Sequence, residues 1–216
     1  MLHYNTITPL LHSILADLIS ADVFKDFRLV GGTALSLHRG HRMSVDIDLF
    51  TDAEYGSVDF NAIDTFLRSN YSYVDTNNYD IIGMGKCYFI GDSQLKCIKL
   101  DLFYTDKFID KIILIDGLRL ASIEEIISMK MDVILRTGRK KDFWDLHELM
   151  EHFTLREMIS FYKKRYPFGH HENEIFDAIL NISSADNDLD PVCIKSKFWE
   201  LIKFDLIEAV ELLGPR

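Results

Sequence analysis

Residues 29–50 read LVGGTALSLHRGHRMSVDIDLF, and this stretch decides the fold. It begins as a short apolar strand that runs through Gly31 and Gly32 into a helix, which ends near Gly40. It closes with residues 45–50, where apolar and acidic residues alternate as they do in a strand. A short helix and a return loop would bring the glycines beside the acidic residues, so the stretch predicts a strand–helix–strand unit.

Asp46 and Asp48 lie on one face of the closing strand, because side chains alternate with a period of two. Val45, Ile47 and Leu49 are expected on the other face. Two carboxylates that share a half-buried face repel each other unless a cation lies between them, and hard oxygen ligands suit Mg²⁺. A solvent-exposed edge strand is the alternative interpretation of this pattern taken alone.

A third carboxylate interrupts a second apolar strand. Alternation places Asp101 on one face with Lys99 and Phe103. If this strand pairs beside residues 45–50, three carboxylates converge, which is a ligand set that can hold two divalent ions about 3.5–4 Å apart. An exposed aspartate with a lysine partner is the alternative.

Three further positions suggest phosphate chemistry. Gly31 and Gly32 would let a triphosphate approach the backbone, and amides at a helix N-terminus favour its charge. Lys130 lies within an apolar helical stripe, since the residues three and four positions away on both sides are apolar. Such a lysine either reaches the phosphates of a nucleotide or pairs with a buried carboxylate.

Composition excludes several classes of protein. With 48% apolar residues the 216-residue chain can form a core, and its net charge of −10 argues against general coating of nucleic acid. The basic clusters at residues 136–141 and 163–165 are interpreted as solvated faces unless they form local nucleic-acid patches. No stretch is long enough to cross a bilayer and no signal pattern is present, so a cytoplasmic protein without a membrane partner is expected. The histidines, His41 included, lack metal-ligand spacing and are expected at the surface or in loops.

The order of elements predicts an α+β fold with two regions. Strands and helices alternate over residues 1–121, whereas residues 122–216 have helical patterns only, opened by Ser122 and Glu125 as a capping box. Strands are expected at 79–90 and 95–104, a hairpin at 112–120, and two final helices at 195–204 and 206–213.

The motifs together resemble the AbiEii/AbiGii-type nucleotidyltransferase toxins of bacterial abortive-infection and toxin–antitoxin systems, within the DNA polymerase β-like superfamily. The resemblance covers residues 29–146. The similar segments are GGTAL at 31–35, HRxSxDIDLF at 41–50, KLD at 99–101, SMK at 128–130 and RKKDxxDL at 139–146. The wider superfamily more often has Gly-Ser where this chain has Gly31-Gly32.

This resemblance implies a nucleotidyltransferase-like mixed sheet flanked by helices, and an NTP as substrate. Mg²⁺, or Mn²⁺ in its place, is expected on Asp46, Asp48 and Asp101, with these three and Lys130 as catalytic residues. The expected nucleotide-binding residues are Gly31, Gly32, Thr33, Arg42, Ser44, Lys130, Asp142 and Asp145.

The resemblance also implies partners. The expected acceptor is RNA, such as the 3′ end of tRNA, whose hydroxyl attacks the α-phosphorus of the NTP while Asp101 acts as base. A cognate antitoxin protein is expected, and residues 122–216 are expected to complete the active site and select the acceptor. The alternatives are transfer to a small-molecule or protein hydroxyl, and a nucleotide-binding module without turnover.

Overall fold

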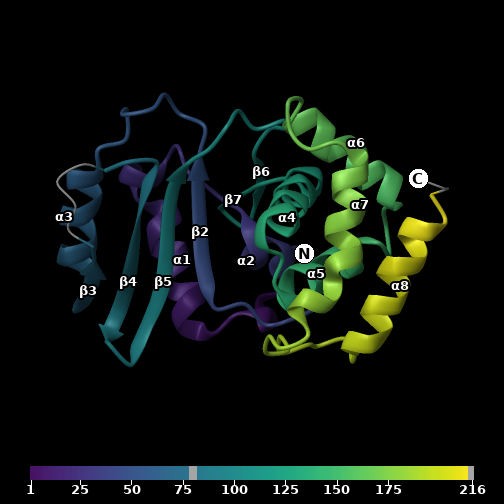
Figure 1. The fold of residues 1–216 in the computed structure, drawn as a ribbon. Helices are drawn as coiled ribbons and strands as arrows, with labels where there is room; N and C mark the ends of the chain where they lie inside the picture. Colours follow the sequence, from purple (N-terminus) through teal and green to yellow (C-terminus); the bar gives the residue numbers. More distant parts are fainter. Residues whose placement is uncertain (78–81, 214–216) are drawn as a thin grey trace.

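The computed structural model of the protein describes residues 1–77 and 82–213. It contains a seven-stranded mixed sheet, with helices packed on the sheet and a further group of helices after it (Figure 1). The predicted α+β class is confirmed. The prediction of two regions divided near residue 121 stays a prediction, although the last strand does end at Leu120.

The sheet places two acidic strands side by side. Its order is β3-β4-β5-β2-β1-β7-β6. The pairs β2–β5 and β1–β7 are parallel, and all other neighbours are antiparallel. The strands are β1 (Arg28–Leu29), β2 (Asp46–Thr51), β3 (Tyr73–Thr76), β4 (Gly85–Ser93), β5 (Lys96–Tyr104), β6 (Ile113–Ile115) and β7 (Leu118–Leu120).

Several helices begin at residues whose side chains accept hydrogen bonds from the free backbone amides. Thr8 caps α1, Ser122 caps α4, and Thr154 with Glu157 forms a reciprocal capping box at α6. The α-helices are α1 (Pro9–Ser20), α2 (Gly31–Arg39), α3 (Phe60–Asn70), α4 (Ile123–Thr137), α5 (Lys140–Leu149), α6 (Leu155–Arg165), α7 (Glu172–Leu180) and α8 (Trp199–Glu211). Short 3₁₀ helices cover Tyr4–Thr6, Asp22–Phe24 and Asn181–Ala185.

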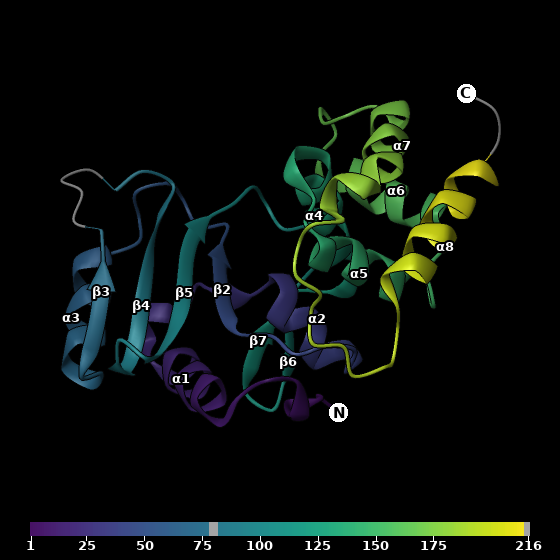
Figure 2. The same ribbon diagram turned by 60° about the horizontal axis from the view of Figure 1, so that its bottom comes forward.

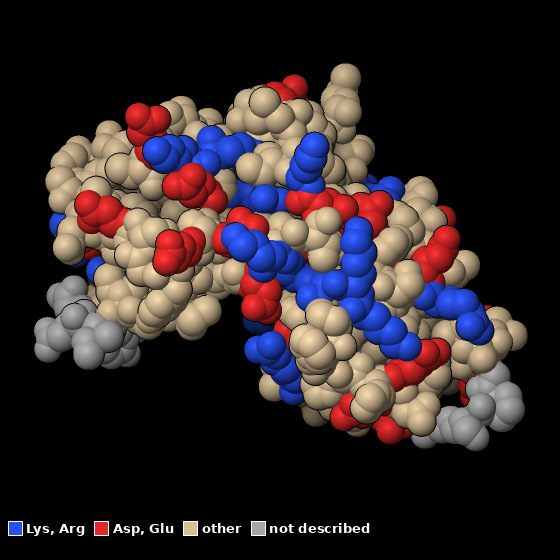
Figure 3. All heavy atoms as spheres, turned by 90° about the horizontal axis from the view of Figure 1, so that it is seen from above, with Lys and Arg blue, Asp and Glu red and all other residues tan. Residues whose placement is uncertain are grey.

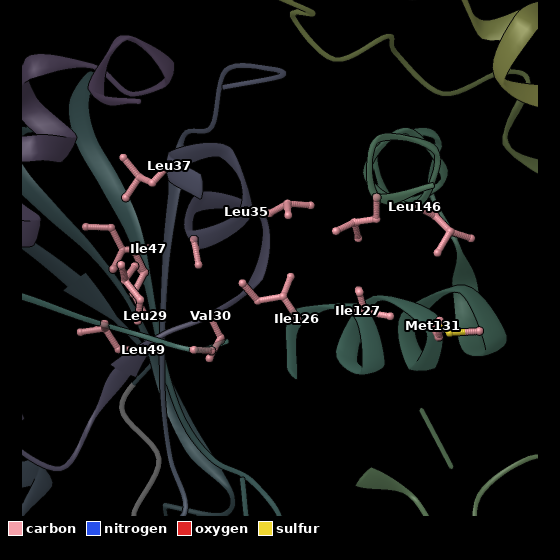
Figure 4. Packing of buried hydrophobic residues seen from close by; sticks show 14 of the residues in the cluster. Leu29, Val30, Leu35, Leu37, Ile47, Leu49, Ile126, Ile127, Met131 and Leu146 are labelled. Atoms are coloured by element: carbon pink, nitrogen blue, oxygen red, sulfur yellow. The ribbon is translucent and has the colours of Figure 1, made fainter. Parts of the chain in front are cut away.

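Helix α2 connects the core of the sheet to the core of the helices. Its residue Leu37 lies on the side of Ile47 of β2, while Leu35 points towards Leu146 of α5 (Figure 4). All of these side chains are fully buried. Figure 2 shows α4 to α8 grouped beyond α2, with α3 beside β3 at the opposite end of the sheet. In the ranges that the structure describes, no helix has the length and apolarity needed to cross a membrane.

Several predicted elements differ from the observed ones. The strand expected at residues 79–90 begins at Gly85, and residues 79–81 of that prediction lie outside the described residues. Strand β3 was not predicted. The two final helices are one helix, α8. The capping box predicted at Ser122 is half correct, because the Ser122 hydroxyl accepts from the Glu125 amide but the Glu125 carboxylate accepts from the Ile109 amide instead.

Candidate active site

Strands β2 and β5 bring the acidic residues together. They are parallel neighbours in a register that sets Asp48 beside Asp101 and Asp46 beside Lys99. Alternation along β2 is as predicted, since Ile47 and Leu49 are buried and the two aspartates are half-buried on the other face. The exception is Val45, which precedes the strand and is 59% exposed.

The charges of the adjacent carboxylates are only partly compensated. Burial, and then the charge of Asp101, raise the pKa of Asp48 to about 6. One oxygen of Asp101, Oδ2, forms an ion pair with Lys99. The other oxygen is buried and, among the described residues, receives no hydrogen bond from an N–H or O–H group. Burial and Asp101 together raise the pKa of the neighbouring thiol of Cys87 to about 11.

Gly31 lies directly against Asp48. It begins helix α2 with a φ of +68°, and a Cβ atom at this position would collide with Oδ2 of Asp48. A Cβ at Gly32 would lie 2.7 Å from the guanidinium of Arg42. Side chains are therefore excluded at both glycines, and the first amides of α2 stand close to the carboxylates.

Gly31→Ala is expected to cost more stability than Gly117→Ala. Both residues have positive φ, which costs an alanine about 1–2 kcal/mol, but a Cβ at Gly117 would meet nothing within 4 Å. The difference between the two losses of unfolding free energy, measured in urea, isolates the collision with Asp48. Equal losses would show that Asp48 moves aside without cost.

Behind the carboxylates lies a buried cluster of ion pairs. Asp145, which is 0% exposed, accepts hydrogen bonds from Arg42 at 2.6 and 2.8 Å and from His41 at 2.7 Å. Lys130 pairs with Asp145 at 2.7 Å and with Asp142 at 2.8 Å. Burial opposes the charge of Asp145, but Arg42 and Lys130 outweigh it and hold its pKa well below the ordinary range.

The predicted nucleotide-binding residues fall into two groups. Six of them line one cavity with Asp46, Asp48 and Asp101, and two, Thr33 and Asp145, do not; the six are Gly31, Gly32, Arg42, Ser44, Lys130 and Asp142. In contrast, the hydroxyl of Thr33 is buried between the Ser44 hydroxyl, 2.8 Å away, and the carbonyl of Asp46. Thr33 and Ser44 thus hold the loop before β2. Of the two interpretations of Lys130, pairing with buried carboxylates is the one observed, and any contact with a nucleotide stays a prediction.

Sequence reasoning missed three residues of this site. His41 was expected at the surface or in a loop and is instead fully buried on Asp145. Lys99 was recognised only as a partner of Asp101. Lys141, on the first turn of α5, places its Nζ 3.8 Å from Oδ2 of Asp46. The available signal was the run of basic residues before Asp142, which on sequence grounds also suited a solvated face.

Two cavities meet at Asp46. One, of about 200 Å³, contains the carboxylates, and the other, of about 460 Å³, opens towards residues 188–192. Lining residues common to both are Arg42, Ser44, Asp46, Arg139 and Lys141. Such a pair of cavities can receive a ligand whose charged part lies at the carboxylates and whose larger part lies against the exposed side chains of Val45, Leu189 and Val192.

The carboxylates do not form a ready-made metal site. Within residues 1–77 and 82–213, no three His, Cys, Asp or Glu side chains are placed so as to hold a metal ion. Lys99 covers one oxygen of Asp101, and Lys141 stands near Asp46. The adjacent pair Asp48 and Asp101 nevertheless has the chemistry that a divalent cation suits, namely crowded hard oxygens, one of them without a donor.

The chain is similar to known proteins over most of its length. A family model described as "Nucleotidyl transferase AbiEii toxin, Type IV TA system" matches residues 13–191. An uncharacterised protein of Aquifex aeolicus is 33% identical over 159 residues, which are 70% of this chain and 72% of the relative.

Solved structures share the fold. The nucleotidyltransferase toxin MenT4 of Mycobacterium tuberculosis superposes with a TM-score of 0.55 at 13% identity, covering 94% of this chain and 84% of that one. An H. pylori protein classed as a nucleotidyltransferase superposes with a TM-score of 0.61 at 21% identity, covering 94% of this chain and 91% of that one.

Proposed function

The chain belongs to the AbiEii family of nucleotidyl transferase toxins, and we propose that it transfers an NMP from an NTP to a hydroxyl of RNA. The proposed acceptor is the 3′ end of tRNA, and the proposed metal is Mg²⁺. It is a nucleotidyltransferase of a family that belongs to type IV toxin–antitoxin systems, which implies an antitoxin partner. Both the metal and the RNA acceptor are part of the proposal.

The observation that carries the proposal is the register of β2 and β5. It sets the carboxylates of Asp48 and Asp101 side by side, next to Gly31, whose lack of a side chain lets Asp48 lie against the start of α2. Nucleotidyl transfer needs this combination, because negative charge must be both bound and neutralised as pyrophosphate leaves.

Asp48 and Asp101 would hold the Mg²⁺ ion, with Asp46 as a further ligand once Lys141 moves away. A bound divalent ion would neutralise charge on the phosphates and relieve the repulsion that raises the pKa of Asp48. Mn²⁺ has the same preference for oxygen ligands and could replace it.

The donor would lie across the two cavities. Its phosphates would contact the amides of Gly31 and Gly32 and the ammonium of Lys141, whose pKa is lowered by burial and by the neighbouring charge of Arg139. An anion here would relieve the crowding of cations. The base and ribose would lie in the larger cavity, against Val45 and Leu189.

Transfer itself requires a proton acceptor. We assign this role to Asp101, whose Oδ1 has no N–H or O–H donor among the described residues. The acceptor oxygen forms a bond to the α-phosphorus, the bond from that phosphorus to the bridging oxygen of the β-phosphate breaks, and pyrophosphate leaves as Asp101 takes the hydroxyl proton. Lys130 and Asp145 hold α4 and α5 behind the site.

The test incubates the protein with each α-³²P-labelled NTP, total tRNA and Mg²⁺, with EDTA in a parallel sample. Label is expected on RNA with Mg²⁺ and is expected to be absent with EDTA, and the accepted NTP identifies the donor base. Label on protein or on a small molecule would show that this molecule, and not RNA, is the acceptor. Nucleotide binding without any transfer would indicate a binding module.

A further inference from the structure

A cavity of about 650 Å³ lies at the end of the sheet towards which β2 and β5 run. Its walls are residues 106–109, which follow β5, Asp132 and Arg136 of helix α4, and residues 162 and 164–170 at the end of α6 and after it. It contains aromatic side chains and cations, among them Tyr162, Tyr166, Phe168, Lys107, Arg136 and Lys164.

Buried Arg165 joins the walls of this cavity. Its side chain is 0% exposed and forms an ion pair with Glu125 of α4. It also donates hydrogen bonds to the Thr105 hydroxyl at 2.7 Å and to the Lys107 carbonyl at 3.4 Å. Because one arginine ties α4, α6 and the segment after β5 together, the cavity is a fixed feature of the fold.

The cavity continues the active-site face of the sheet. Phe103 follows Asp101 by two residues on the same face and packs edge-on against Phe50, with 6.0 Å between ring centroids. At about 3.3 Å per residue, the end of β5 is roughly 10 Å beyond Asp101. Helix α4 borders both cavities, with Val133 facing the carboxylates and Arg136 facing the larger cavity.

The chemistry of the cavity suits a single nucleic-acid strand. Phe168 is fully exposed at the tip of the segment after α6. Arg136 is 71% exposed and lies 2.7 Å from Asp132, a mostly buried carboxylate of the cavity wall, whereas Lys164 is 59% exposed and lies 3.5 Å from Asp110. The pair of Lys164 and Asp110 is exposed and contributes little to stability, so a phosphate can compete for Lys164, and the guanidinium of Arg136 remains open to water on its exposed side.

Seen from this end, the molecule carries a gathering of basic side chains. Figure 3 shows Lys and Arg clustered across the middle of the face, beside the notch that separates its two parts. In a chain with a net charge of −10, such a cluster is the part of the surface to which a polyanion would be attracted.

We propose that this cavity binds the single-stranded end of the RNA acceptor. Bases stack on Phe168 and Tyr166, the phosphates contact Lys107, Arg136 and Lys164, and the strand passes over Phe103 so that its terminal hydroxyl reaches Asp101. This inference rests on the proposed RNA acceptor and adds where that RNA is held.

The test measures binding of a short fluorescein-labelled single-stranded RNA, and of tRNA, to the full chain by anisotropy without NTP. The variants are Phe168→Ala and Lys164→Glu, with Lys163→Glu as the matched control. Lys163 is adjacent, 49% exposed and paired with Glu172, and it does not line the cavity. Melting temperatures of all four proteins verify folding.

Phe168→Ala is expected to weaken RNA binding about fivefold or more through lost stacking. Lys164→Glu is expected to weaken it further and to reduce its dependence on salt, while Lys163→Glu stays within about twofold of the unmodified protein.

Three results would overturn the proposal. If both cavity variants bind RNA like the control while the unmodified protein labels tRNA, RNA binds elsewhere and the proposed function stands. If the unmodified protein binds no RNA and labels another acceptor, the RNA acceptor of the proposed function fails as well. If the cavity variants still bind RNA but no longer bind an antitoxin protein, the surface is a protein interface.

Discussion

Asp48→Asn is expected to lower the rate of nucleotidyl transfer by about a thousandfold and, at the same time, to stabilise the fold. The rate falls because the variant loses the charge that would hold the metal and counter the cations of the site. The stability rises because keeping the buried carboxylate ionised, with its pKa near 6, costs about 3 kcal/mol at neutral pH.

The gain in stability has a defined dependence on pH. The pKa of Asp48 is raised in the folded state, so the penalty is absent below the unfolded pKa near 4, grows as pH rises to about 6, and is complete above it. In urea with EDTA, the unfolding free energies of the unmodified protein and Asp48→Asn should therefore differ at pH 8 and agree at pH 4. Full-rate transfer by the variant would remove Asp48 from the mechanism, and lower stability at pH 8 would contradict the assigned burial penalty.

Asp145→Asn is expected to cause the largest loss of stability, about 3–5 kcal/mol. The variant removes the one carboxylate shared by Arg42, His41 and Lys130. It leaves Lys130 with Asp142, and leaves Arg42 without an ion pair among the described residues. Because small domains are stable by only about 5–15 kcal/mol, this loss would bring the protein close to unfolding. The measurement is the free energy of unfolding in urea.

A matched control is available on helix α3. Asp64→Asn removes a carboxylate that also has two cationic partners, Arg68 and Lys86, but is 26% exposed. The loss of unfolding free energy in Asp64→Asn is expected to stay within about 1 kcal/mol, since water screens exposed pairs. Similar losses in the two variants would show that the buried cluster around Asp145 contributes no more than a surface ion pair.

The acidic part of the site could be predicted because it depends on local alternation. A period of two places Asp46 with Asp48, and the expectation that β5 pairs beside β2 is confirmed by the register of Asp48 with Asp101. The cluster behind it could not be predicted. His41 meets Asp145 across 104 positions of sequence, and no local pattern specifies which distant carboxylate a histidine will meet.

The fold was predictable where one face of an element is clearly apolar. The hairpin of β6 and β7 and the strand β5 are confirmed at nearly the expected residues. Strand β3 was missed because it is short, partly exposed and without clear alternation. Helix α8 is expected to break at Asp205, but this carboxylate is half-buried against α5, where it bonds His147, so the helix continues through it.

The position of α2 has a consequence for how the molecule unfolds. Leu37 belongs to the packing of the sheet and Leu35 to that of the later helices, so neither half can open without exposing α2 to water. We therefore expect a single cooperative transition, and expect neither half to be exchangeable as an independent module. The same helix begins at Gly31 beside the carboxylates, so the end of α2 at which we propose that phosphates bind loses its shape when either half unfolds. We therefore expect that partial unfolding does not leave a partly active enzyme.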